Sequence, residues 1–137
     1  MIVEDNIISD SFIYNILNKT KCKIYSKYNF NIKGIDYILE HNNLLLCFQD
    51  KINCNNNDIN NFNSTLNLLK VEFNKFNLIG IYLTNKLSYC YKQKANINNI
   101  IIINGENLYT IKYKLLEYLY SLNIYNYDNN NDIIMLN

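Results

Sequence analysis

Polar side chains lie near the start of one apolar segment and at the end of the next, between residues 34 and 51. Asp36 lies in GIDYILE, and Gln49, Asp50 and Lys51 end the run LLLCFQDK. A carboxylate and an amide oxygen are hard ligands of the kind Mg²⁺ prefers, and a lysine beside them can bind a phosphate. The residue types therefore predict a site for metal-assisted chemistry on a phosphate, provided that the fold brings Asp36 beside Gln49 and Lys51.

A β-hairpin is the element that must position these side chains. The segments 34–40 and 44–51 predict two antiparallel strands joined by the polar turn His41-Asn42-Asn43. Side chains alternate along a strand, so Gln49 and Lys51 share one face. The same alternation predicts two faces on the first strand, one with Ile35, Tyr37 and Leu39 and the other with Asp36, Ile38 and Glu40.

The rest of the chain alternates between helical and extended patterns. Apolar residues at helical spacing predict helices over 7–18, 58–76 and 108–122, with Asp58 or Asn61 as the N-cap of the second. Short β-branched runs predict strands at 22–28, 78–84 and 98–104. This order predicts an α/β domain with a mixed sheet, in which the helix over 58–76 crosses over to a parallel strand.

Length and composition indicate one soluble domain. A chain of 137 residues with 49% apolar residues is long enough to bury a continuous core in a single domain, and we place that domain at 1–123 with 124–137 as an unassigned tail. The apolar runs are too short to span a membrane, and the acidic start does not resemble a signal or transit peptide. We expect an intracellular protein, cytoplasmic or nuclear, without a membrane partner. Its four cysteines lack metal-ligand spacing and are expected to be reduced.

The net charge of +1 hides an uneven distribution of lysines. The segments 11–35 and 73–105 contain lysines and no acid. They are compatible with a surface that faces nucleic-acid phosphates, and equally with lysines spread over a solvated surface.

Three stretches together resemble a known nuclease family. GID at 34–36 followed by QDK at 49–51 resembles the catalytic signature of PD-(D/E)XK nucleases, specifically of Mrr-like restriction endonucleases. LIGIYLTN at 78–85 is similar to a buried strand of that family, and NIIIINGENL at 99–108 is similar to its final strand, turn and helix start. The chain has only three glycines, and all three occupy matching positions.

The resemblance implies a restriction-endonuclease-like mixed β-sheet flanked by helices, and a DNA endonuclease that hydrolyses phosphodiester bonds with Mg²⁺ or Mn²⁺. It implies that Asp36 and Gln49 bind the metal through side-chain oxygens and that the Asp50 carbonyl adds a backbone ligand. Lys51 would orient or help deprotonate the attacking water. Many such nucleases act as homodimers. The sequence does not distinguish DNA from RNA.

Two departures from the family pattern leave other functions open. The residues before GID are Asn31-Ile32-Lys33, and Ile52 replaces the basic or aromatic residue common after Q-x-K. With the neutral Gln49, the site has one carboxylate where many relatives have two; Asp10 is the candidate for an additional acid. The alternatives are a catalytically inactive nuclease-like module that binds nucleic acid or scaffolds a complex, and a small α/β interaction protein.

Overall fold

A five-stranded mixed sheet forms the centre of the molecule. A computed structural model describes residues 10–27, 30–54, 56–87 and 100–125, and the following statements concern these residues. The strands lie in the order β1-β2-β3-β4-β5. Their bounds are β1 Lys23–Ser26, β2 Tyr37–His41, β3 Leu44–Cys54, β4 Asn77–Leu87 and β5 Ile100–Asn104. The helices are α1 Asp10–Leu17, α2 Asn56–Glu72 and α4 Leu108–Ser121.

The sheet changes from antiparallel to parallel at β3. β1, β2 and β3 pair antiparallel, whereas β3 pairs parallel with β4, and β4 pairs parallel with β5. The α2 helix connects the parallel strands β3 and β4, as the sequence predicts. The expected α/β class with a mixed sheet is therefore confirmed.

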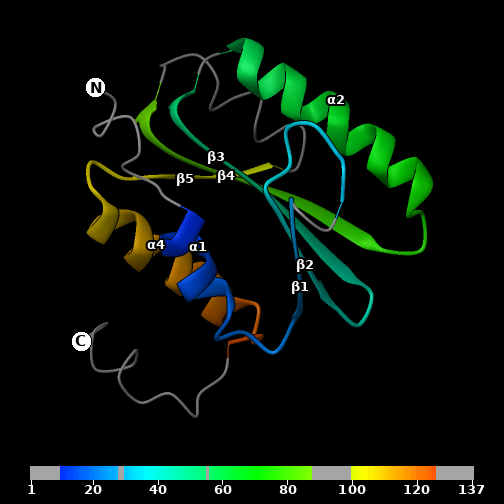
Figure 1. Cartoon of the computed structure of the whole chain (residues 1–137), viewed down its shortest axis with the longest axis horizontal. Helices are drawn as coiled ribbons and strands as arrows, with labels where there is room; N and C mark the ends of the chain where they lie inside the picture. The colour runs from blue at the N-terminus through cyan, green and yellow to red at the C-terminus, as the bar shows by residue number, and fades with distance from the viewer. Residues whose placement is uncertain (1–9, 28–29, 55, 88–99, 126–137) are drawn as a thin grey trace.

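Helices cover both faces of the sheet. Figure 1 shows α2 on one side of the strands and α1 with α4 on the other. No helix in the described part of the chain is both long enough and apolar enough to cross a membrane. The arrangement has three layers, so each face of the central strands packs against a helix.

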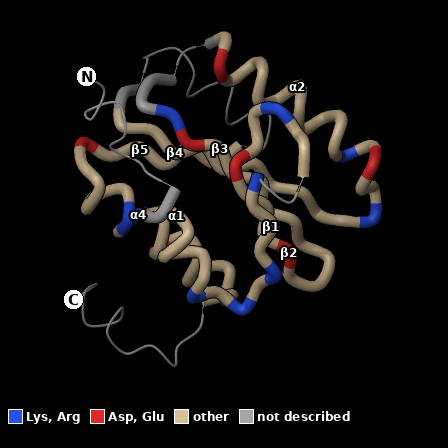
Figure 2. Tube along the Cα trace, in the orientation of Figure 1, with Lys and Arg blue, Asp and Glu red and all other residues tan. Residues whose placement is uncertain are grey.

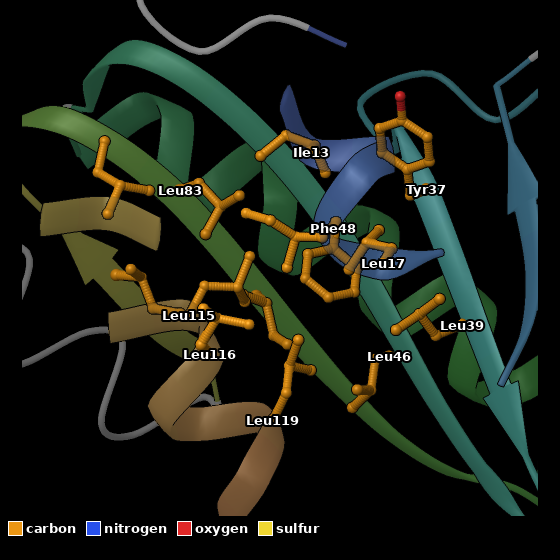
Figure 3. Close-up of a cluster of buried hydrophobic side chains, with 14 of the residues drawn as sticks. Ile13, Leu17, Tyr37, Leu39, Leu46, Phe48, Leu83, Leu115, Leu116 and Leu119 are labelled. Atoms are coloured by element: carbon orange, nitrogen blue, oxygen red, sulfur yellow. The ribbon is translucent and has the colours of Figure 1, made fainter. Parts of the chain in front are cut away.

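Two apolar cores follow from these layers. One core joins the sheet to α1 and α4, and Figure 3 shows Phe48 and Leu83 of the strands among the leucines of these helices. Ile124 and Tyr125, which the sequence left in the unassigned tail, are about 1% exposed and belong to this core. The second core joins the sheet to α2 through buried residues that include Phe62, Leu66 and Tyr82. The strands β2, β3, β4 and β5 each contribute residues to both cores, so the central part of the sheet is buried on both faces.

Gly80 allows α2 to lie close to the sheet. A Cβ at this position would clash with Leu66 Cδ1 and would lie 2.9 Å from Phe62 Cε2. Leu66 and Phe62 both lie on the buried side of α2. The small residue in β4 therefore determines how closely the helix that borders the candidate site packs.

Most predicted elements are present with shifted ends. α2 begins at Asn56 and ends at Glu72, so Asp58 lies in its first turn and neither predicted N-cap residue precedes the helix. The hairpin turn has two residues between His41 and Leu44, and Asn42 adopts a φ of 56°. Asparagine tolerates this left-handed conformation better than most residues. The predicted helix start at 7–9 and the segment 88–99 lie outside the described residues.

Candidate functional site

The backbone changes register where β2 begins. The β2–β3 ladder pairs Tyr37 with Phe48, yet the amide of Asp36 donates to the same Phe48 carbonyl at 2.7 Å. The Asp36 carbonyl in turn accepts from Lys27 N at 3.0 Å. Asp36 is therefore held between two neighbouring segments by its backbone, one residue before the regular strand.

The alternation predicted for the first strand is correct for residues 37–39 and wrong for Ile35. Tyr37 and Leu39 pack in the core with α1 and α4, and Ile38 packs in the core with α2, as expected. Ile35 lies in the α2 core with Ile38, although it was predicted to share a face with Tyr37. The regular strand starts only at Tyr37, so the period of two does not extend back to Ile35.

The Asp36 carboxylate binds the backbone of β3. Its Oδ2 accepts a hydrogen bond from Asp50 N at 3.0 Å in a partly buried position. In a strand, the N–H and C=O of one residue point to the same neighbouring strand. The Asp50 carbonyl therefore faces the edge of β3 on which Asp36 lies. The structure brings these two predicted site residues together.

Gln49 and Lys51 share a second feature, a polar cavity between β3 and α2. The cavity has a volume of about 380 Å³. Lys33 and Gly34 border it before β2, and the first turns of α2 close the other side. Its described lining residues are Lys33, Gly34, Gln49, Lys51, Asp58, Asn61, Phe62, Ser64 and Thr65. Because side chains alternate, Gln49 and Lys51 reach this α2 side of the sheet together.

Gly34 shapes the wall of the cavity. Its φ is +88°, a conformation that glycine adopts far more readily than residues with a Cβ. A Cβ there would lie 4.0 Å from Gln49 Oε1 and 3.9 Å from Thr65 Oγ1, which are ordinary contacts. The backbone conformation, rather than lack of space, is the physical reason for a glycine at this position.

Asp58 is the acid among the cavity residues from α2, none of which the sequence identified as part of a site. Its Oδ1 lies 3.4 Å from Lys51 Nζ, and the two side chains are 18% and 50% exposed. The sequence pattern predicted only a helix-capping role for Asp58. Asp58, Asn61 and Thr65 recur at spacings of three and four, so a polar stripe beside the apolar face was readable from the sequence.

The three predicted catalytic residues thus have different surroundings. Gln49 and Lys51 line the cavity, whereas Asp36 is not among its described lining residues and contacts the backbone of β3. Residues 49–51 of β3 connect the cavity with the hydrogen bond between Asp36 and Asp50. Within the described ranges, no three His, Cys, Asp or Glu side chains cluster as a metal site. Any metal at this position would depend on amide and carbonyl oxygens as well as carboxylates.

Two polar residues near the carboxyl ends of the parallel strands β4 and β5 lie in the same row as Lys51. The ladders pair Lys51 with Thr84, and Thr84 with Asn104. Thr84 is fully buried, and Asn104 Oδ1 is buried without a hydrogen-bond partner in the described part of the chain. The carboxyl ends of parallel strands are a common location for ligand sites. The polar row is therefore continuous with the cavity end of β3.

Lysines are not gathered on one face of the described molecule. Figure 2 shows them on several elements, including the turn that follows α1 and the C-terminal end of α2. Lys33 of the first acid-free segment lines the cavity, whereas Lys23 lies 5.3 Å from the centroid of the Tyr25 ring. Lys92 and Lys94 of the second segment lie outside the described residues. Of the lysines in the two acid-free segments, only Lys33 is among the described lining residues of the cavity, and the basic surface stays a prediction.

No protein-family model, no curated protein and no solved structure matches this chain.

Proposed function

We propose that this protein is a metal-dependent DNA endonuclease with a restriction-endonuclease-like fold of the PD-(D/E)XK type. The observation that carries the proposal is that Asp36 of the GID motif contacts the QDK motif of β3 at residues 49–51. The Asp36 carboxylate lies 3.0 Å from Asp50 N, and the flanking Gln49 and Lys51 line one cavity. The mixed sheet with α2 as the crossover agrees with the fold that the motifs imply.

The donor groups at this end of β3 suit a hard divalent ion. Asp36, Gln49 and the Asp50 carbonyl offer carboxylate, amide and backbone oxygens, which are the ligand types that Mg²⁺ and Mn²⁺ take. A carboxylate has about four lone-pair sites, so the hydrogen bond from Asp50 N is compatible with metal binding. When bound, the ion would polarise the scissile phosphate and favour ionisation of an attacking water.

Lys51 supplies the positive charge on the cavity side of this segment. Its ammonium would contact the phosphate and offset the negative charge that develops during attack. Lys33 borders the same cavity and would hold a neighbouring phosphate. Gln49 is neutral, so the DNA phosphate would complete the coordination of the metal.

Cleavage of supercoiled plasmid in Mg²⁺ and in Mn²⁺ tests the proposal. We expect nicked and linear products from the wild type and a loss of about 10²-fold or more in rate for Lys51→Ala. Lys75→Ala is the matched control, because Lys75 is exposed just after α2 and does not line the cavity. Equal rates for the wild type and Lys51→Ala would refute the assignment of Lys51.

A second candidate function is nucleic-acid binding without cleavage. Two lysines and the hydroxyl groups of Ser64 and Thr65 border the cavity, while Asp58 is the one acid among its described lining residues. Such a module would bind DNA with an affinity that falls steeply as salt rises, and it would leave the plasmid intact. A protein that neither cleaves nor binds DNA would overturn both candidates and favour an interaction protein.

A further inference from the structure

Lys51 lies beside a carboxylate that belongs to another element of the fold. Its Nζ is 3.4 Å from Asp58 Oδ1, and half of the lysine side chain is exposed. A lysine has a flexible four-carbon stem and about 2 kcal/mol of rotamer entropy. Without a partner, its ammonium would therefore sample many positions around the cavity.

Asp58 is attached to a well-anchored part of α2. The next residue, Ile59, is fully buried, and Phe62 one turn later is 1% exposed. Both pack in the core between α2 and the sheet. The Asp58 carboxylate therefore starts from a fixed backbone position in the wall of the cavity.

The ion pair between Lys51 and Asp58 contributes little to the free energy of unfolding. Ion pairs with an exposed member contribute about 0–1 kcal/mol, because water screens the charges and ordering both side chains costs entropy. What the pair does provide is a direction for the Lys51 side chain, from β3 toward the cavity wall formed by α2.

We propose that Asp58 is a positioning residue of this site, which holds the Lys51 ammonium where a substrate phosphate enters the cavity. The inference rests on the proposed function, in which Lys51 acts on that phosphate. In this role Asp58 acts through Lys51. Loss of its charge should lower kcat and leave KM nearly unchanged, because DNA binding depends on several other contacts.

Three variants test this role by plasmid-cleavage kinetics. Asp58→Asn keeps the shape and removes the charge, Asp58→Glu keeps the charge on a longer stem, and Glu72→Gln removes an exposed acid from the other end of α2. We expect kcat to fall about tenfold or more in Asp58→Asn, since misplacing a reacting group by about 1 Å can cost 10²-fold. Asp58→Glu should recover most of this loss, and Glu72→Gln should match the wild type.

A second measurement reports on Lys51 without cleavage. Reductive methylation with ¹³C-formaldehyde labels the lysines, and the Lys51 signal is the one absent from labelled Lys51→Ala. We expect this signal to shift in Asp58→Asn and to stay unchanged in Glu72→Gln. Urea unfolding confirms that each variant is folded.

The outcomes separate the two proposals. A wild type that cleaves, with Asp58→Asn cleaving equally fast or an unmoved Lys51 signal, overturns the positioning role and leaves the nuclease intact. Equal losses in Asp58→Asn and Asp58→Glu would assign Asp58 a structural role and also overturn it. A folded wild type that does not cleave in either metal overturns the proposed function and, with it, the role of Asp58.

Discussion

Replacing Asp36 separates two roles of one carboxylate. In the structure, Asp36 Oδ2 accepts a hydrogen bond from Asp50 N at 3.0 Å, and in the proposed mechanism the same side chain binds the metal. Asp36→Asn keeps an oxygen that can accept from Asp50 N but removes the charge. Asp36→Ala removes the acceptor altogether. The two variants should therefore differ in stability and agree in lost cleavage.

The magnitudes follow from the geometry of this bond. A hydrogen bond to a charged group contributes about 1.5–3 kcal/mol to the free energy of unfolding, and a neutral one about 1 kcal/mol. The site is partly buried, so we expect Asp36→Ala to lose about 2 kcal/mol and Asp36→Asn about 1 kcal/mol. With a urea m-value of about 1.5 kcal/mol/M, the alanine variant should unfold at a midpoint lower by about 1 M.

Urea unfolding followed by far-UV circular dichroism or by tyrosine fluorescence measures these shifts, because the chain has 13 tyrosines and no tryptophan. Glu106→Gln is the control, since this exposed acid should change stability by less than about 0.5 kcal/mol. A wild-type midpoint for Asp36→Ala would refute the stabilising role of the hydrogen bond. Wild-type cleavage by Asp36→Asn would refute the role of Asp36 as a metal ligand.

Two further predictions concern the core between α2 and the sheet. Gly80→Ala should destabilise the protein by about 1–3 kcal/mol, because the added Cβ would clash with Leu66 and approach Phe62; a thermal midpoint equal to that of the wild type would contradict this packing. Cys47 is fully buried, and burial raises the pKa of its thiol to about 12, so alkylation at pH 8 should require unfolding. The unfolded thiol ionises near its ordinary pKa of 9.0, so its contribution to stability is present below pH 9 and is lost as pH rises toward 12. Relative to Cys47→Ala, the wild type should lose about 2–3 kcal/mol between pH 9 and pH 11, and an unchanged difference would refute the prediction.

Local patterns were sufficient for most of the elements. Short β-branched runs predicted β4 and β5, and helical spacing of apolar residues predicted α2 and α4. These patterns work because burial on one helix face or on both sheet faces is already encoded in neighbouring residues. The parallel pairing of β3 and β4 was predictable for a related reason, since a helix between two strands favours a crossover connection.

The candidate site was only partly readable in this way. The types of Asp36, Gln49 and Lys51 indicated metal and phosphate chemistry, and alternation along β3 correctly grouped Gln49 with Lys51 on the side of the cavity. The sequence alone thus determined the class of the fold, the faces of the regular strands and the choice of Asp36, Gln49 and Lys51 as candidate site residues.

Tertiary structure decided the remaining features, because each depends on groups that are distant in sequence or on irregular backbone. The strand begins at Tyr37 after Gly34 has turned the chain at φ +88°, and this irregular entry moved Ile35 into the α2 core. The same entry brought the Asp36 carboxylate to the amide of Asp50. Packing of α2 over Gly80 placed Asp58 beside Lys51. The periodicity of a sequence describes the repeat of a regular helix or strand. It does not give the residue at which that element begins or ends, or the helix turn that packs against it.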